Sequence, residues 1–249
     1  MSKDLFSGQS ADYARYRPSY PIELIEYITA FVKEKNKVWD CATGNGQAAV
    51  LLAPHFKQVC ASDLSAKQIQ QATAHPKVVY TVCQAEQTPY DDNSFDLITV
   101  AQAYHWLNFD AFAKEAERVS KPGGTIAVWC YGLFFTEDDN MNRLIKDFYT
   151  GTVGPYWDKE RKYIDEELKT VPFPYKEAEV KKSFSITVNW DINDVCGYIS
   201  SWSSVQHFIK ERGFNPLDEL CSQLHAYDKD NSRKDFQFPV YLRIGKIEK

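Results

Sequence analysis

Val38-Trp-Asp-Cys-Ala-Thr-Gly-Asn-Gly-Gln47 is the stretch of sequence that decides the fold. Apolar residues lead to Asp40, a turn with two glycines follows, and the run Ala48-Ala-Val-Leu-Leu52 then opens a helix. A strand, a glycine-containing turn and a helix in this order is how doubly wound α/β folds bind a nucleoside. Gly44 and Gly46 permit a tight turn and leave room for a ligand where a Cβ atom would collide.

Asp40 narrows the choice of nucleoside ligand. It lies four residues before Gly44, where a carboxylate would repel the phosphate oxygens of a dinucleotide. The same carboxylate suits a ligand with positive charge, such as the ammonium and sulfonium groups of S-adenosylmethionine. The stretch therefore predicts a methyltransferase that uses this cofactor.

The bulk composition is ordinary for a soluble globular protein. The chain has 249 residues, of which 44% are hydrophobic and 25% charged, and its net charge is −5. This length suits one large α/β domain spanning 1–249, and the acidic balance predicts neither a nucleic-acid nor a membrane partner. No apolar run approaches the roughly 20 residues that cross a bilayer. The N-terminus lacks the apolar segment of a signal peptide, so we expect a cytoplasmic protein of unknown oligomeric state.

The six cysteines have no C-x-x-C spacing. Four fall at or near the ends of predicted strands and two lie in helical segments: Cys41, Cys60, Cys83, Cys130, Cys196 and Cys221. We interpret all six as buried, reduced thiols that behave as small hydrophobic residues. We therefore predict no metal site.

Strand-length apolar runs alternate with helical stretches through the first half of the chain. The predicted strands are 37–41, 58–62, 78–83, 95–100 and 124–131, and the predicted helices are 47–55, 65–74 and 109–119. This alternation predicts a parallel sheet with crossover helices. We assign 1–35 to an N-terminal lid and helix, and 36–131 to the cofactor-binding core.

The second half of the chain changes character. Segment 132–179 is rich in aromatic and charged residues, with a predicted helix at 137–149, and we interpret it as a helical and irregular cap insertion. Segment 180–249 returns to strands at 180–189 and 236–247, with helices at 191–200, 203–212 and 216–226 between them. Pro239 suggests an end or an irregular position in the last strand. The prediction is a doubly wound, mostly parallel sheet of seven strands with an antiparallel last strand.

Asp63 follows the second predicted strand, nineteen residues after Gly44. An acid at this place is how such folds hold a ribose diol. The alternative is a helix N-cap, since Asp63 and Ser65 both precede the helix that starts at Ala66. Together with Asp40 and the glycines, ribose binding is the favoured interpretation.

A third motif makes a family resemblance specific. Gln84-Ala-Glu86 precedes the fourth strand, and Lys121-Pro-Gly-Gly124 precedes the fifth. Together with the two earlier motifs, these stretches resemble those of the type 11 group of class I S-adenosylmethionine-dependent methyltransferases. The resemblance implies S-adenosylhomocysteine as the product of the reaction. The resemblance implies that ten positions bind the cofactor: Asp40, Ala42, Gly44, Gly46, Gln47, Asp63, Leu64, Ala85, Glu86 and Ala101. Gln84 replaces the usual acid of the adenine loop, so its carbonyl, the Glu86 carboxylate and the Ala85 backbone are alternatives there.

Two further segments resemble a narrower group. Val100-Ala-Gln-Ala-Tyr-His-Trp106 and Tyr13-Ala-Arg-Tyr-Arg-Pro-Ser-Tyr-Pro21 are similar to small-molecule methyltransferases typified by trans-aconitate methyltransferase. That resemblance implies an N-terminal segment folded over the cofactor and a His-Trp turn beside the transferred methyl group. It makes His105 and Trp106 the catalytic candidates and Tyr20 a substrate-binding candidate.

The chemistry of the acceptor decides which other residues are needed. Trp106 and Trp129 are the aromatic residues that we expect near the methyl group, because ring faces favour a cation. A carboxylate acceptor is already ionised and needs a guanidinium to hold it, for which Arg17 and Arg15 are candidates. A hydroxyl or amine acceptor needs a base, for which His105 is the candidate, although His105 also suits a structural position.

We therefore expect a methyltransferase that methylates a carboxylate oxygen of a small molecule. Methylation of a hydroxyl or amine with His105 as base is the first alternative. A non-catalytic cofactor-binding module and a nicotinamide-dependent reductase are the others. The reductase shares the glycine turn, but Asp40, the Gln84-Ala-Glu86 loop and the absence of a Tyr-x-x-x-Lys pair argue against it.

Overall fold

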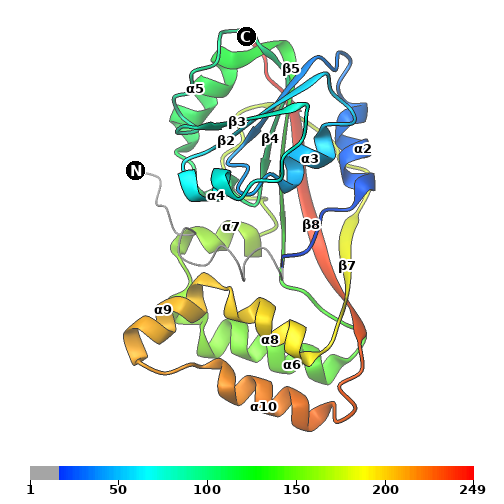
Figure 1. Ribbon diagram of the computed structural model, residues 1–249, viewed down its shortest axis with the longest axis vertical. Helices are drawn as coiled ribbons and strands as arrows, with labels where there is room; N and C mark the ends of the chain where they lie inside the picture. The colour runs from blue at the N-terminus through cyan, green and yellow to red at the C-terminus, as the bar shows by residue number, and fades with distance from the viewer. Residues whose placement is uncertain (1–16) are drawn as a thin grey trace.

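The computed structural model describes residues 17–249. Tyr13 and Arg15, which the sequence placed in the lid, lie outside the described residues. An α/β layer forms the upper part of the molecule in Figure 1, and a group of helices forms the lower part. The long strands β7 and β8 run from one part to the other.

Eight strands form one sheet in the order β3-β2-β1-β4-β5-β8-β6, with β7 also paired to β8. Their bounds are β1 Lys37–Cys41, β2 Gln58–Asp63, β3 Val78–Val82, β4 Phe95–Ala101, β5 Ser120–Tyr131, β6 Lys176–Ala178, β7 Phe184–Trp190 and β8 Lys234–Lys246. Strands β1 to β5 pair in parallel, whereas β8 is antiparallel to β5. The predicted class, a mostly parallel Rossmann-like sheet with an antiparallel last strand, is confirmed.

The count of strands differs from the predicted seven because one edge strand is interrupted. Both β6 and β7 pair antiparallel to β8, at Ala178↔Ile244 and Phe184↔Val240. They therefore follow each other along the same edge of β8. Strand β6 lies in 132–179, the segment interpreted from the sequence as a cap insertion.

Alternating side chains of the parallel strands serve two separate apolar cores. In β1, Val38 belongs to the core beneath α2 and α3, whereas its neighbour Trp39 belongs to the core beneath α5. The helices that cover these faces are α2 Ile22–Ala30, α3 Gln47–Leu52, α4 Ala66–Gln70 and α5 Phe109–Val119, and Figure 1 shows α5 opposite α2 and α3. Burial on both faces explains why these strands are continuous apolar runs.

The lower part consists mostly of helices, as predicted for the cap and C-terminal segments. Its elements are α6 Asp139–Asp147, a π-helical turn Phe148–Thr152, the 3-10 turns Gly154–Tyr156 and Lys159–Arg161, α7 Lys162–Asp165, α8 Ile192–Ser200, α9 Ser203–Arg212 and α10 Leu217–Tyr227. The core beneath α2 and α3 continues into this part through Phe134, Phe238 and Trp202. This continuous packing ties the cap to the sheet.

Two sequence expectations need correction. Cys196 in α8 and Cys221 in α10 form a disulfide, whereas all six cysteines were expected to be reduced; the other four are free thiols. Two cysteines in helical segments 25 residues apart gave no sign that their helices pack together. Pro239 lies inside β8 rather than at its end, one residue beyond the last β5–β8 pair. No helix among residues 17–249 is long and apolar enough to span a membrane.

Candidate cofactor and acceptor site

A cavity of about 200 Å³, here called the main cavity, opens at the carboxyl ends of β1, β2 and β4. Because these strands are parallel, the turns that follow them meet at one edge of the sheet. Eleven of the residues predicted from the sequence line it: Arg17, Tyr20, Ala42, Gly44, Gln47, Asp63, Leu64, Ala85, Glu86, Ala101 and Trp106. Asp40, Gly46, His105 and Trp129 do not line it.

Asp63 connects the first two strand-to-helix turns. Its Oδ2 accepts a hydrogen bond from the backbone N–H of Gly44 at 2.8 Å, and its Oδ1 accepts one from Ser65 N–H at 2.8 Å. The N-cap of α4 is Ser65, whose side chain accepts from Gln68 N–H. Asp63 is therefore not the cap residue, and it lines the main cavity.

Asp40 lies behind the glycine turn and is fully buried. Its Oδ1 accepts from Thr99 Oγ1 at 2.8 Å and its Oδ2 accepts from Thr43 Oγ1 at 2.5 Å. Burial, together with the nearby Asp63 carboxylate, raises the pKa of Asp40 to about 6, although the two threonine hydrogen bonds act in the opposite direction. Asp40 thus supports the glycine turn through its hydrogen bond with Thr43. It can influence a cationic ligand only through the electric field of its charge.

Gly46 is required by the protein's own packing. Its φ is +85°, and a Cβ atom there would lie 2.1 Å from the hydroxyl oxygen of Tyr80. That hydroxyl donates to the carbonyl of Thr73 at 2.7 Å. Gly44, with φ +58°, lines the main cavity. A Cβ atom placed there would have Oε1 of Gln68 as its nearest neighbour, at 4.0 Å. The two glycines therefore serve different purposes, which the sequence motif does not separate.

The loop after β3 supplies Ala85 and Glu86 to the main cavity, whereas Gln84 does not line it. Glu86 Oε1 accepts from the backbone N–H of Asn108 at 3.1 Å. Asn108 is the N-cap of α5, so Glu86 links this loop to the start of that helix.

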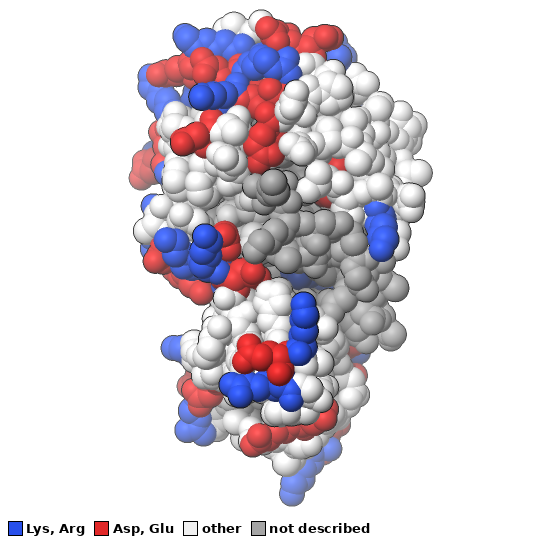
Figure 2. Space-filling view, turned by 90° about the vertical axis from the view of Figure 1, so that its left-hand side faces the viewer, with Lys and Arg blue, Asp and Glu red and all other residues white. Residues whose placement is uncertain are grey.

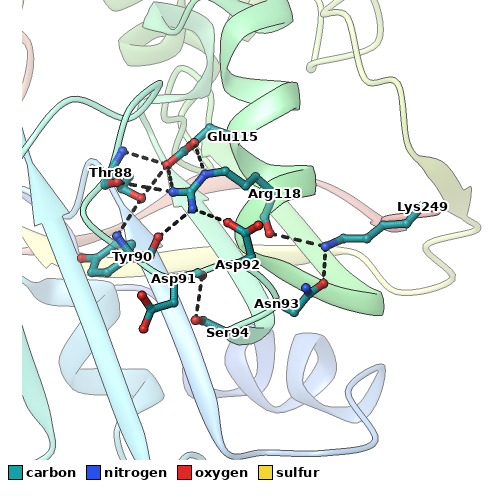
Figure 3. Close-up of polar contacts among 9 residues, drawn as sticks. All are labelled: Thr88, Tyr90, Asp91, Asp92, Asn93, Ser94, Glu115, Arg118 and Lys249. Atoms are coloured by element: carbon teal, nitrogen blue, oxygen red, sulfur yellow. Dashed lines mark hydrogen bonds and ion pairs between the residues drawn. The ribbon is translucent and has the colours of Figure 1, made fainter.

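A network of polar contacts holds the same loop to α5 (Figure 3). Glu115 Oε1 accepts from both the backbone N–H and the hydroxyl of Thr88, at 2.8 and 2.6 Å. Arg118 donates to both carboxylate oxygens of Glu115, to the Tyr90 carbonyl and to Asp92. Burial raises the pKa of Glu115, but the hydrogen bonds from Arg118 and Thr88 outweigh it and lower the pKa below its ordinary value. The network fixes the loop that carries Ala85 and Glu86.

A smaller hollow of about 60 Å³, here called the second hollow, adjoins the main cavity. Arg17, Gln102 and Trp106 line both. The remaining walls of the second hollow are His105, Trp157, Asp158, Arg161, Ile164, Tyr198, Trp202 and Ser203. All of these except His105 come from the cap and from the α8–α9 region of the C-terminal segment, so the second hollow lies between these elements and the turn after β4.

Arg17 lies at the junction of the two spaces. Its Nη1 donates to the hydroxyl of Tyr131 at 2.7 Å, and its guanidinium lies 5.8 Å from the centre of the Tyr198 ring. Tyr131 is the last residue of β5 and also lines the main cavity. The sheet and the cap therefore both position this guanidinium.

The aromatic residues predicted near the reacting atoms separate into two groups. Trp106 lines both spaces. Trp129 is 1% exposed and stands behind Tyr20, whose ring meets it edge-on at 5.5 Å. Tyr20 therefore presents its ring to the main cavity, and Trp129 supports it.

His105 lines the second hollow and is 5% exposed. Burial, together with the nearby Arg161 guanidinium, lowers the pKa of His105 to about 3. The imidazole is therefore neutral at physiological pH and a weak base. A low basicity of this kind could not be anticipated from the sequence, because its causes are burial and a cap residue.

Arg161 of the cap and Tyr198 of the C-terminal segment line the second hollow, but neither was predicted from the sequence. Arg161 ends a 3-10 turn and Tyr198 lies in α8, and both line the second hollow. No motif marks either one, and helical periodicity alone would assign Tyr198 to the core. Among residues 17–249, no three His, Cys, Asp or Glu side chains gather closely enough to hold a metal ion.

A family model for a methyltransferase domain matches residues 39–128, from β1 into β5. A protein of Dictyostelium discoideum named as a methyltransferase is 37% identical over 98% of this chain and 95% of its own length. This chain belongs to the class I S-adenosylmethionine-dependent methyltransferases.

Other similarities agree with this family. A solved structure from Anaeromyxobacter dehalogenans, named as a type II methyltransferase, is 32% identical and has a TM-score of 0.86. The match covers 94% of this chain and 99% of that chain. A Saccharomyces cerevisiae protein named as an S-adenosylmethionine-dependent methyltransferase is 29% identical over 49% of this chain and 45% of its own length.

The walls of the main cavity fit this family's cofactor. The Asp63 carboxylate beside the Gly44 turn suits a ribose diol, and Leu64, Ala85 and Leu107 provide apolar surface for a purine. Arg17 is the only Lys or Arg among the described residues that line the cavity, so a pyrophosphate would find few cations there. The chemistry of the site therefore agrees with S-adenosylmethionine better than with a dinucleotide.

Proposed function

We propose that the protein transfers the methyl group of S-adenosylmethionine to a carboxylate oxygen of a small molecule. The observation that carries this proposal is the position of Arg17, which lines both the main cavity and the second hollow. An arginine at this junction can hold a carboxylate through paired N–H···O hydrogen bonds next to the methyl-donor site.

Each part of the cofactor has candidate partners in this proposal. Asp63 accepts hydrogen bonds from the ribose hydroxyls, and Leu64, Ala85 and Glu86 surround the adenine. Ala42, Gly44, Gln47 and Ala101 contact the amino-acid part, while Asp40 and Gly46 act from behind the turn. The support for this assignment is that all but these last two line the main cavity.

The residues at the junction have simple tasks in a displacement of this kind. When bound, S-adenosylmethionine supplies the methyl group from its sulfonium, and the electron pair of the broken C–S bond stays on sulfur. Arg17 orients the acceptor carboxylate, whose oxygen forms the new C–O bond; because the carboxylate is already ionised, no residue removes a proton. Trp106 and Tyr20 provide aromatic surface that excludes water and tolerates the dispersing positive charge.

The properties of His105 favour a carboxylate over a hydroxyl or an amine. With a pKa of about 3, this imidazole holds a proton too weakly to act as an efficient general base near neutral pH. The alternative in which His105 deprotonates a hydroxyl or amine therefore lacks support. The reductase alternative and the non-catalytic module are disfavoured by the similarity of the whole chain to methyltransferases.

A small molecule is the proposed type of acceptor, in line with the resemblance to the trans-aconitate methyltransferase group. Acidic and basic side chains are interspersed over the face that Figure 2 shows, rather than gathered into one basic stripe. With the net charge of −5, this distribution supports the proposal that nucleic acid is not the substrate. A cytoplasmic location remains an expectation from the sequence.

The test is transfer of labelled methyl from S-adenosylmethionine to a panel of small carboxylic acids, phenols and amines, followed by alkali. We expect alkali to release the label as methanol, because alkali hydrolyses a methyl ester. Label that resists alkali would contradict the proposal. Arg17→Met should raise the KM for the acid about tenfold or more, whereas Arg143→Met, which removes an exposed arginine of α6, should leave it unchanged.

A further inference from the structure

Arg161 is the second guanidinium of the second hollow. It ends the 3-10 turn Lys159–Arg161, and it lines this hollow together with His105 and Trp106 of the turn after β4. Unlike Arg17, it does not line the main cavity. Arg161 therefore lines only the hollow that adjoins the main cavity, whereas Arg17 lines both spaces.

The polar contacts between the cap and the Arg161 guanidinium all involve its Nε edge. Its Nε donates to the hydroxyl of Tyr149 at 2.7 Å and lies 3.5 Å from Asp165 Oδ1. The guanidinium is stacked against the Trp157 ring at 4.6 Å and the Tyr149 ring at 5.3 Å. Such contacts fix the plane of the guanidinium and reduce the entropy that it would lose on binding a ligand.

The outer edge of the guanidinium is available to a ligand. Within residues 17–249, neither Nη atom of Arg161 makes a hydrogen bond. A guanidinium has five N–H donors, and four of them are on the Nη atoms. A planar pair of N–H groups that make no other hydrogen bond matches the two oxygens of a carboxylate, or of another oxyanion, in bidentate geometry.

The charges around the second hollow favour an anion. Among residues 17–249, Arg17 and Arg161 are the cations that line it, Asp158 is the carboxylate that lines it, and His105 is neutral. Asp158 Oδ2 is buried without a hydrogen bond and lies 3.9 Å from Nδ1 of His207. Asp165 touches Arg161 on the Nε side, away from the available Nη atoms. The lining therefore keeps a net positive charge.

We propose that Arg161 is a substrate-recognition residue that binds, through its two Nη atoms, a second anionic group of the acceptor. This inference rests on the proposed carboxylate methylation and adds where the rest of the acceptor lies. The carboxylate to be methylated sits at the junction with Arg17 and Trp106. The second anionic group, remote from the reacting oxygen, extends into the second hollow as far as Arg161.

Matched pairs of acids test this assignment. The probes are the linear dicarboxylates from malonate to adipate, each compared with its monomethyl ester, which keeps the carbon skeleton and one carboxylate. For the wild-type protein, we expect a kcat/KM at least tenfold higher for the best diacid than for its monoester. Arg161→Met should raise the KM for that diacid ten- to hundredfold, while the KM for S-adenosylmethionine and the rate with the monoester stay within twofold.

Two controls separate recognition from a structural effect. Arg212 also donates from Nε to a tyrosine hydroxyl, Tyr156 at 2.6 Å, and stacks on its ring at 6.0 Å, but it lines neither space. Arg212→Met should therefore keep the preference for the diacid. Arg161→Lys keeps the charge but not the bidentate geometry, so it should lose part of the preference for the diacid. This variant provides the test if Arg161→Met fails to fold. Calorimetric binding of the diacid in the presence of S-adenosylhomocysteine gives the same comparison without turnover.

The outcomes distinguish the two proposals. If wild-type protein esterifies acids but both Arg161 variants keep the full preference for the diacid, the assignment of Arg161 is wrong and the proposed function stands. Equal kcat/KM for diacids and monoesters in the wild-type protein leads to the same conclusion. If no acid receives a base-labile methyl group, both proposals fail together.

Discussion

The carboxylate of Asp63 accepts a hydrogen bond from the backbone N–H of Gly44 at 2.8 Å, across nineteen residues of sequence. One end of β2 thereby fixes the glycine turn after β1, while the same carboxylate lines the main cavity. The acid that is expected to bind the ribose therefore also shapes the turn beside it. The proposed cofactor contact and the local structure of the turn therefore involve the same side chain.

Replacing Asp63 by Ala should weaken S-adenosylhomocysteine binding about ten- to hundredfold. The change removes the proposed acceptor of the ribose hydroxyls, which also accepts from the Gly44 and Ser65 N–H groups, and hydrogen bonds to charged groups contribute about 1.5–3 kcal/mol each. Titration calorimetry measures the Kd directly. Asp110→Ala, which removes an exposed carboxylate at the start of α5, is the control that should leave the Kd unchanged. A Kd unaltered in Asp63→Ala would show that the main cavity is not the cofactor site.

Asp40 should make the stability of the protein depend on pH in the acidic range. Its folded-state pKa, about 6, lies above the ordinary value of 3.8, so the folded state holds this proton more tightly than the unfolded state does. The contribution of Asp40 to stability therefore falls as the pH rises from about 4 to about 6. Each pH unit in that interval corresponds to about 1.4 kcal/mol, so the full loss is on the order of 3 kcal/mol.

Asp40→Asn is the variant that tests this dependence, because an amide does not titrate. The free energy of unfolding of the wild-type protein relative to Asp40→Asn should decrease between pH 4 and 6 and then level off. Denaturant unfolding at several pH values measures the difference. A difference that is constant over this range would mean that Asp40 titrates near its ordinary pKa.

Gly46→Ala should destabilise the fold more than Gly123→Ala does. Both glycines have positive φ, +85° and +69°, but a Cβ atom at Gly123 would meet nothing within 4 Å. The left-handed conformation alone costs about 1–2 kcal/mol for an alanine, so the excess at Gly46 reports the collision with Tyr80. Thermal unfolding measures both, and the addition of Tyr80→Phe should recover part of the excess. Equal losses for the two alanine variants would argue against the close approach of Tyr80.

The disulfide between Cys196 and Cys221 predicts a defined number of reactive thiols. Unfolded protein without reductant should react with a thiol reagent at four cysteines, and reduced protein at six. Replacing both Cys196 and Cys221 by Ser should lower the free energy of unfolding by roughly 3 kcal/mol, because the bond restricts the unfolded chain. Six reactive thiols before reduction would show that the two cysteines are not joined.

The first half of the chain could be predicted from sequence because its signals are local. The glycine turn after β1 and the acid at the end of β2 lie at strand ends, and parallel strands bring such ends together at one edge of the sheet. The position of a residue within a motif does not show, however, whether its side chain lines the cavity or packs behind the residues that do. Asp40 and Trp129 both belong to predicted site motifs, yet both are buried behind the residues that line the main cavity.

The cap could not be predicted in the same way. Arg161 lies in a 3-10 turn and Tyr198 in α8, 37 positions later, and only the packing of the cap brings both to the second hollow. The disulfide between α8 and α10 depends on the same packing. No local spacing records contacts of this kind.

The sequence by itself determined the fold class, the cofactor family and eleven of the residues that line the main cavity, because these depend on short motifs at the ends of parallel strands. Only the tertiary structure decided the low basicity of His105, the burial of Asp40 and the presence of two arginines in one hollow. Burial within the folded protein, and charges contributed by segments distant in the sequence, set these properties, and local spacing records neither of them.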